Sequence, residues 1–341
     1  MRFGIFSNGN RHNQVAKLSY DEDMQEIVLA DELGIGEAWL SEHGTLLGFQ
    51  APDQLPSADL FICKAAALTK QIKMGPGIRA LPHYHPLQVA TDAAVCDHLT
   101  NGRYYAGFGV GFGGGKYPQR GVLPGDHREM FREAVDLILT AWTAEDKFDW
   151  KGQFWPGEQL HIIPKPLTKP HMDVGIACSR SEGTLELTAQ KGFMPLMIWT
   201  AHPHHVRDMI GIYLRASDKA SRDRVRVARV VYVTDSVKQA KKELQGSDLE
   251  GALSAGRLDA FLRPGDTRAD LSMEYLIDNG GAYCGDPDTV YDGIKSFYEE
   301  TGGFGVLMLT GGKDWGTWEQ RAQSMKWFMK EVAPRLAALE P

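Results

Sequence analysis

Apolar segments of strand length alternate with amphipathic helical segments along most of this 341-residue chain, at a period of roughly 35 residues. The spacing predicts strands at residues 2–6, 37–40, 72–78, 104–110, 173–177, 196–199, 225–233 and 306–309. It predicts helices at residues 21–33, 58–68, 87–99, 128–140, 181–191, 205–216, 238–244, 286–300 and 318–339. Eight strands, each followed by a helix, predict an α/β fold of the (β/α)8 TIM-barrel type. A doubly wound open sheet is the alternative.

Two segments interrupt this rhythm. Residues 148–170 are aromatic and rich in proline, and they predict an irregular insertion. Residues 245–285 fit no clean strand–helix unit and predict a long loop or short helices over the barrel mouth. We therefore interpret residues 1–341 as a single barrel domain with insertions at the C-terminal ends of its strands.

Composition and charge narrow the possible partners. The formal net charge of −7 and the absence of a basic run argue against nucleic acid. No apolar run reaches 18 residues, so no membrane span is predicted, and Met1–Phe6 is typical of a strand rather than a signal peptide. The four cysteines are far apart in sequence, which favours reduced thiols in the cytoplasm over disulfides or a zinc site.

Polar residues follow the predicted strand at residues 37–40, where a parallel barrel would bind its ligand. His43 could accept or donate a proton near neutral pH, or it could be a structural histidine that hydrogen-bonds loop backbone. Glu42 could orient His43 or cap a neighbouring loop. Adjacent strand residues point to opposite faces, so both side chains enter one pocket only if the chain bends, and Gly44 could supply that bend.

Two further segments allow more than one interpretation. His83 and His85 could contribute to a metal site, but Pro82 and Pro86 favour a rigid turn there. The glycines from 109 to 115 lack the Gly-Lys-Ser/Thr of a phosphate loop, and they are typical of a loop that lets a flat ligand approach the backbone.

The segment 179–184 opens a predicted helix directly after a strand. Two hydroxyls, Arg180 and the free amides of the helix N-terminus suit a phosphate group. The alternative is that Ser181 is an N-cap with Thr184 in the first turn, which explains Ser181 but leaves Arg180 unexplained.

A series of short motifs resembles the bacterial-luciferase-like flavin-dependent monooxygenases. The motifs lie, in order, at residues 1–6, 33–43, 75–78, 81–86, 97–103, 182–189 and 285–290. The spacing at residues 104–117 and the ending at residues 301–334 are similar to members that oxidise cyclic ketones and terpenes.

The resemblance implies a barrel that binds reduced FMN at its strand ends. Such a protein takes the flavin from a separate NAD(P)H-dependent flavin reductase and oxygenates a small hydrophobic substrate with O2 through a C4a-peroxyflavin. A homodimer is also implied. Two alternatives are a deazaflavin-dependent dehydrogenase or reductase on the same barrel, and a non-catalytic flavin-binding relative.

The resemblance also assigns roles to individual residues. His43 matches the histidine near the reacting edge of the flavin. Gly77 and Ile78 match the segment that packs on the isoalloxazine, where some members have a non-proline cis peptide bond, and His85 matches a histidine at the mouth. Ser181 and Thr184, with Gly183 between them, match the phosphate-binding positions.

The chain departs from the family pattern at two positions. Many members have a second histidine where this chain has Gly44, and the smaller residue predicts a larger site. Many carry arginine where this chain has Val110, so one cofactor contact is lost at that position, and Arg180 is the expected substitute.

Overall fold

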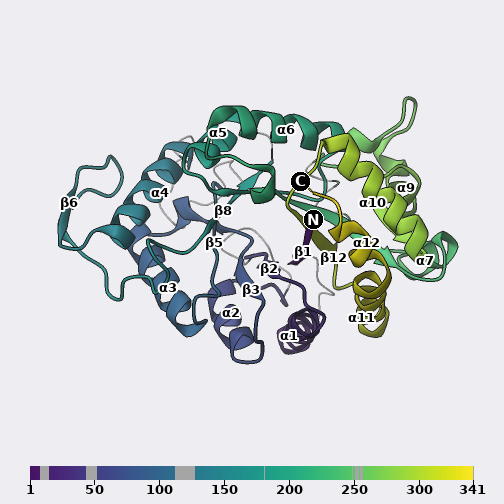
Figure 1. Cartoon of the computed structure of the whole chain (residues 1–341), viewed down its shortest axis with the longest axis horizontal. Coiled ribbons are helices and arrows are strands. Elements are labelled where there is room, and N and C mark those ends of the chain that lie inside the picture. Colours follow the sequence, from purple (N-terminus) through teal and green to yellow (C-terminus); the bar gives the residue numbers. More distant parts are fainter. Residues whose placement is uncertain are drawn as a thin grey trace.

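The computed structural model describes residues 1–7, 15–43, 52–111, 127–179, 181–247, 249, 253 and 256–340. Parallel strands form its centre and helices surround them (Figure 1). The strands of this main sheet are β1 (Arg2–Ser7), β2 (Glu37–Leu40), β3 (Lys73–Pro76), β4 (Arg79–Ala80), β5 (Ala106–Gly109), β8 (Val174–Cys178), β9 (Met194–Met197), β10 (Arg226–Val233), β11 (Ala282–Gly285) and β12 (Val306–Gly311).

The order of the strands shows how the sheet curls into a barrel. Neighbouring strands run β3-β2-β1-β12-β10-β9-β8-β5-β4, and β11 pairs with β10 beside this path. β3 and β4 belong to one chain segment that is interrupted at Gly77–Ile78. The amide of Met74 donates to the carbonyl of Arg103 at 2.8 Å, and the amide of Tyr105 donates to the carbonyl of Met74 at 2.8 Å. These bonds join the two ends of the sheet, so the predicted barrel is confirmed and the open sheet is wrong.

Helices pack around the outside of the barrel, between the strands and solvent. They are α1 (Ala16–Glu32), α2 (Ala58–Ala66), α3 (Pro86–Leu99), α4 (His127–Thr143), α5 (Glu182–Gln190), α6 (Pro203–Ala216), α7 (Val237–Glu243), α9 (Met273–Asp278), α10 (Pro287–Thr301), α11 (Trp318–Trp327) and α12 (Ala333–Ala337). α1 begins at Ala16, five residues before the predicted helix start at residue 21. A π-helical turn (Phe328–Val332) separates α11 from α12 within the predicted closing helix.

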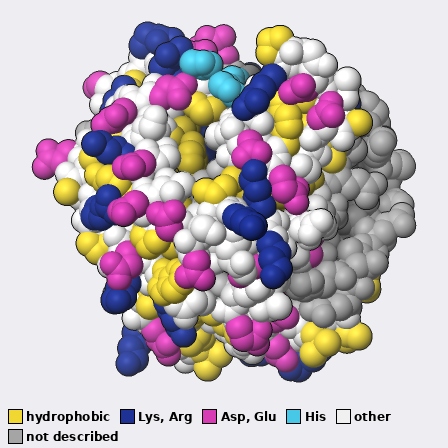
Figure 2. All heavy atoms as spheres, turned by 90° about the vertical axis from the view of Figure 1, so that its right-hand side faces the viewer, with side chains coloured by type: hydrophobic (Ala, Val, Ile, Leu, Met, Phe, Trp, Pro, Cys, Tyr) yellow, Lys and Arg dark blue, Asp and Glu magenta, His cyan; other side chains and the backbone are white. Residues whose placement is uncertain are grey.

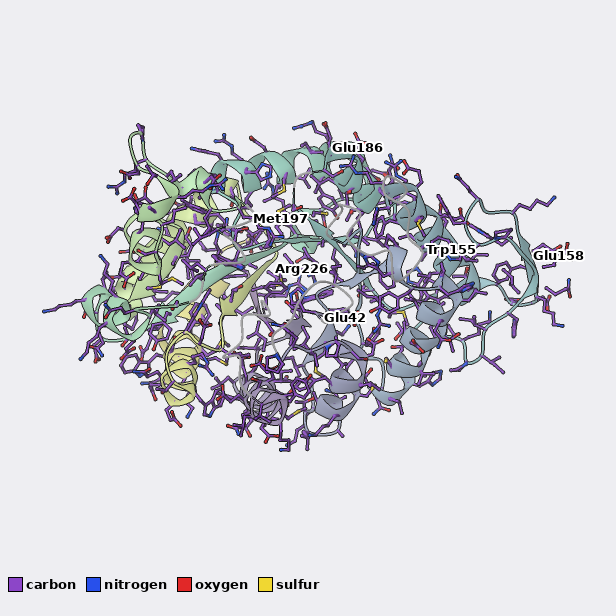
Figure 3. The ribbon with its side chains drawn as sticks, turned by 180° about the vertical axis from the view of Figure 1, so that it is seen from behind. Glu42, Trp155, Glu158, Glu186, Met197 and Arg226 are labelled. Atoms are coloured by element: carbon purple, nitrogen blue, oxygen red, sulfur yellow. The ribbon has the colours of Figure 1, made fainter. Side chains whose placement is uncertain are left out.

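Both predicted insertions contain more regular structure than expected. Residues 148–170 include an antiparallel hairpin of β6 (Phe148–Trp150) and β7 (Gly157–Leu160), which projects from the barrel with Glu158 on its outer arm (Figures 1 and 3). The carboxylate of Glu133 on α4 accepts the amides of residues 153–155, which fixes the hairpin to the helix layer. The segment 245–285 supplies α9 and β11, and β11 extends the sheet through a parallel pairing with β10.

The four cysteines are free thiols, and two of them meet in the fold. Cys63 on α2 and Cys96 on α3 lie with their sulfur atoms 3.6 Å apart, although 33 residues separate them in sequence.

The indole of Trp39 fills the barrel interior. Trp39 is fully buried and stacks on the ring of Tyr105, with centroids 5.3 Å apart and planes 9° apart. Three neighbouring strands carry a glycine where the indole lies. A Cβ atom would come within 3.1 Å of the indole at Gly75 and at Gly107, and within 2.5 Å at Gly175. The glycines therefore make the space that the indole occupies.

A buried ion pair lies beside this indole. Glu37 accepts the Trp39 indole N–H at 3.0 Å and pairs with Arg226, whose Nε and Nη2 each lie 3.2 Å from a carboxylate oxygen. Arg226 projects into the centre of the molecule in Figure 3. The pair satisfies the indole N–H, which would otherwise be buried without a partner at a cost of about 1–3 kcal/mol.

We expect Gly175→Ala to destabilise the protein by about 1–3 kcal/mol, because the added methyl overpacks against the indole. Chemical denaturation measures the change. Gly311→Ala on β12 is the matched control, since a Cβ there meets no atom within 4 Å. In a Trp39→Phe background the Gly175→Ala cost should shrink, because the smaller ring makes room. An equal cost in both backgrounds would contradict the packing explanation.

Candidate active site

Strand β2 divides its side chains between two faces of the barrel wall. Glu37 and Trp39 face the interior, whereas Ala38 and Leu40 pack in the layer between strands and helices. Glu42 continues on this outer face, because its carboxylate reaches the first turn of α2. His43 is half-buried and lies three residues past the end of β2. Continued to His43, the alternation predicts that its side chain faces the interior.

Glu42 caps a neighbouring helix and does not share a pocket with His43. Its Oε2 accepts the amide of Ala58 at 3.3 Å and pairs with Arg79 at 3.0 Å. Of the two interpretations offered for Glu42, capping is the one that the contacts confirm. His43 is held through its backbone, where its amide donates to the carbonyl of Leu55 at 2.8 Å. Gly44 lies outside the described residues.

Gly77, Ile78, Gly109 and Ala177 form an apolar surface at the strand ends above Trp39, which we call the floor of the candidate site. The peptide bond between Gly77 and Ile78 is cis, as the resemblance implied. A Cβ on Gly109 would lie 2.5 Å from Ile78 Cδ1 and 3.5 Å from Ala177 Cβ, so three strand ends meet at this level. Ala177 is exposed although the other residues of β8 are buried. Since Ala177 shares the interior face with Gly175, solvent reaches the floor from the C-terminal mouth.

The N-terminus of α5 lies at the end of β8. Ser181 is its N-cap residue by position, yet its side chain makes no capping hydrogen bond. The amide of Thr184 donates to the carbonyl of Ser181 at 3.1 Å. The simple N-cap interpretation therefore does not account for the Ser181 hydroxyl, which is available to a ligand. Arg180 lies outside the described residues.

An arginine that the sequence did not point to approaches this helix end. A Cβ built on Gly183 would lie 3.2 Å from Nη2 of Arg132, an exposed residue of α4. The amphipathic pattern of α4 predicts only that Arg132 is on a polar face. That this face meets the start of α5 depends on the packing of two helices, which no local motif encodes. A guanidinium beside free helix amides suits a phosphate group.

Two other predicted cofactor residues make contacts of their own. His85 is exposed, and its Nδ1 accepts the amide of Leu87 at 3.3 Å as the N-cap of α3. Val110 is half-buried and packs against the main hydrophobic core. His83 is buried against His127, with ring centroids 6.1 Å apart. Within the described part of the chain, no three His, Cys, Asp or Glu side chains gather closely enough to hold a metal ion.

The geometry defines a parallel barrel whose open mouth combines an apolar floor with a helix N-terminus suited to an anion. The sequence profile of the luciferase-like monooxygenases matches residues 1–304. The chain therefore belongs to the luciferase-like monooxygenase family, as the motifs indicated. Among the described residues, none of the helices is long and apolar enough to span a membrane.

Relatives of known activity match most of the chain. It is 25% identical to 3,6-diketocamphane 1,6-monooxygenase of Pseudomonas putida over 97% of both chains. It is 26% identical to limonene 1,2-monooxygenase of Rhodococcus erythropolis, over 97% of this chain and 86% of that one. It is 27% identical to the oxygenase component of the flavin-dependent trigonelline monooxygenase of Acinetobacter baylyi, over 71% and 67%. Diketocamphane and limonene monooxygenases are thus among its distant homologues, in agreement with the similarity to ketone- and terpene-oxidising members.

Solved structures share the whole fold. The oxygenating constituent of 3,6-diketocamphane monooxygenase from Pseudomonas putida, in complex with FMN, superposes with a TM-score of 0.86 at 24% identity and covers 100% of this chain and 99% of its own. An F420-dependent secondary alcohol dehydrogenase superposes with a TM-score of 0.75 at 17% identity, covering 97% and 98%.

We expect Ser181→Ala to leave stability unchanged, because its hydroxyl caps no helix amide. The matched variant is Ser236→Ala, whose hydroxyl accepts the amide of Gln239 at 3.1 Å at the start of α7. Ser236→Ala should lower the free energy of unfolding by about 1 kcal/mol. Thermal unfolding of both variants measures the difference, and an equal loss at Ser181 would restore the capping interpretation.

Proposed function

We propose that this protein is the oxygenase component of a two-component flavin-dependent monooxygenase, which uses reduced FMN and O2 to oxygenate a small hydrophobic substrate. One observation carries the proposal: half-buried Ile78 and exposed Ala177 lie at the same strand ends as an α5 N-terminus whose Ser181 hydroxyl makes no capping hydrogen bond. A flat apolar ring and a phosphate are the two parts of FMN that such a mouth would bind.

The residues present fit this cofactor. Ser181, Thr184 and the amide of Gly183 would hold the phosphate, with Arg132 as its cation. The apolar floor would receive the isoalloxazine along the Gly77–Ile78 peptide. When bound, the reduced flavin supplies the electrons that activate O2.

The protein's own residues would exclude water and manage a proton. Trp39 and Tyr105 fill the interior beneath the floor and would keep water out from that side. His43, on the interior side of the β2 end, would hold or move a proton at its imidazole during oxygen transfer. Exclusion of water from the site would prevent side reactions such as the hydrolysis of reactive intermediates.

The partners follow from the homologues. Diketocamphane and limonene monooxygenases support a cyclic ketone or terpene as the substrate class. The trigonelline enzyme, named as an oxygenase component, supports a separate NAD(P)H-dependent flavin reductase. Exposed apolar side chains on α2 and α3, at Leu60, Val95 and Leu99, support a homodimer through these helices.

We expect His43→Ala to lower product formation by roughly 10- to 100-fold while FMN binding is largely kept, because the imidazole moves a proton and does not hold the phosphate. The assay supplies reduced FMN, ¹⁸O2 and camphor-type ketones or limonene, and detects ¹⁸O in the product. His161→Ala, which removes an exposed histidine of the 148–170 insertion, is the control. A His43 variant that turns over at the wild-type rate would remove the catalytic role.

We expect Ser181→Ala combined with Thr184→Ala, and separately Arg132→Ala, to raise the Kd for FMN by roughly tenfold, since each removes hydrogen bonds to the phosphate. Fluorescence titration measures the Kd. Titration with riboflavin is the control, because it lacks the phosphate and should bind the wild type and the variants alike. A Kd for FMN that does not change would place the phosphate elsewhere.

The second candidate is a deazaflavin-dependent dehydrogenase, which the superposition on an F420-dependent alcohol dehydrogenase favours. It predicts tight binding of F420 and substrate oxidation without O2. Titration of F420 beside FMN, with anaerobic turnover, separates the two functions.

A further inference from the structure

A buried arginine lies behind the wall of the candidate site. The Arg79 guanidinium is 6% exposed and pairs with two carboxylates that are equally buried. Its Nη2 lies 3.0 Å from Oε2 of Glu42, and its Nη1 lies 2.7 Å from Oδ2 of Asp59. Burial raises the pKa of Asp59, while Arg79 opposes that shift.

Aromatic hydroxyls complete this cluster. Tyr104 donates to Oδ1 of Asp59 at 2.6 Å, and Tyr84 donates to Oε1 of Glu42 at 2.8 Å. The Arg79 guanidinium also lies 5.1 Å from the centre of the Tyr84 ring. Each carboxylate is therefore held from two sides, which fixes its position.

The cluster joins the two chain segments that meet at the site. Glu42 directly precedes His43, and Arg79 directly follows Ile78 of the cis peptide. Asp59 adds the first turn of α2 to the same cluster. The Arg79–Glu42 ion pair thus connects the segment that follows β2 with β4.

Stability alone does not explain such a cluster. Moving charges from water into the interior costs several kcal/mol per ion, and apolar residues of similar volume are often at least as stabilising. The planar Arg79 guanidinium bridges two carboxylates. It therefore fixes the positions of Glu42 and Asp59 relative to each other.

We propose that Arg79 is a positioning residue, which holds the Glu42–His43 segment and the Gly77–Ile78 segment at a fixed separation so that the His43 imidazole faces the floor. The inference rests on the proposed function for what the alignment achieves, but the alignment itself is a property of the protein without cofactor. Arg79 is buried and paired with Glu42 and Asp59, so we assign it a positioning role and not a catalytic one.

The test compares Arg79→Lys with Arg226→Lys. Both arginines are buried and pair with a glutamate. Arg79 pairs with Glu42, two residues past the end of β2, and Arg226 pairs with Glu37, the first residue of β2. Lysine keeps the charge and cannot bridge two carboxylates as a guanidinium does. We expect both variants to lose similar stability, and Arg79→Lys alone to disturb His43.

The first readout needs no cofactor. NMR spectra of the protein with isotope-labelled histidine, with the His43 signal assigned from its loss in His43→Ala, should show that signal shifted or broadened in Arg79→Lys and unchanged in Arg226→Lys. An unchanged His43 signal in Arg79→Lys would overturn the proposal. If Arg79→Lys does not fold, Glu42→Gln weakens the same link and should move the same signal.

The second readout is turnover. Arg79→Lys should lower kcat roughly tenfold, within the range that a small misplacement costs, with KM for reduced FMN changed less than threefold. In a His43→Ala background Arg79→Lys should have almost no further effect, because both changes act through the same imidazole. Losses that simply add would overturn the positioning role. If the wild type shows no FMN-dependent turnover but the His43 signal moves, the proposed function fails and the positioning role stands.

Discussion

The fold depends on the placement of one large side chain, the indole of Trp39, inside the barrel. A tryptophan there needs space, and glycines on three neighbouring strands provide it at Gly75, Gly107 and Gly175. It also needs a partner for its N–H, and Glu37, held by Arg226, accepts that bond. These conditions fix which residues of the three strands can carry side chains at the level of the indole. The centre is filled at that level, and the candidate site lies above it, at the strand ends.

Side chains along β2 alternate between the interior and the outer face of the barrel wall, so one short strand contributes to both. Its interior face carries Glu37 and Trp39 and continues to His43, whereas its outer face continues to Glu42, which α2 and Arg79 hold. Since neighbouring residues point in opposite directions, an anchor on the outer face can set the position of the next residue on the interior face. The proposed support, Glu42, and the proposed catalytic residue, His43, are therefore neighbours in the sequence.

The sequence predicted well those strands and helices whose apolar residues follow a clear local pattern. β2 has the predicted bounds, residues 37–40, because a run of apolar residues ends there in polar ones. The hairpin of β6 and β7 was missed because both strands are largely solvent-exposed and lack a buried, alternating face. β11 was missed because it is four residues long and lies between glycines. The barrel followed from the repeated units, while the cis bond at Gly77–Ile78 came only from the family resemblance.

The position of Val110 bears on how the cofactor phosphate would be held. Many family members carry arginine at this position, whereas Val110 here is half-buried and packs against the hydrophobic core. A valine in place of that arginine contributes an apolar contact and no positive charge. Arg132 belongs to α4, the helix that follows β5 and Val110 in the chain, and its guanidinium reaches the start of α5. We infer that the positive charge expected at the end of β5 comes from the next helix instead. An arginine on a helix can replace an arginine at a strand end, because binding of the phosphate depends on where the positive charge lies in space and not on its position in the sequence.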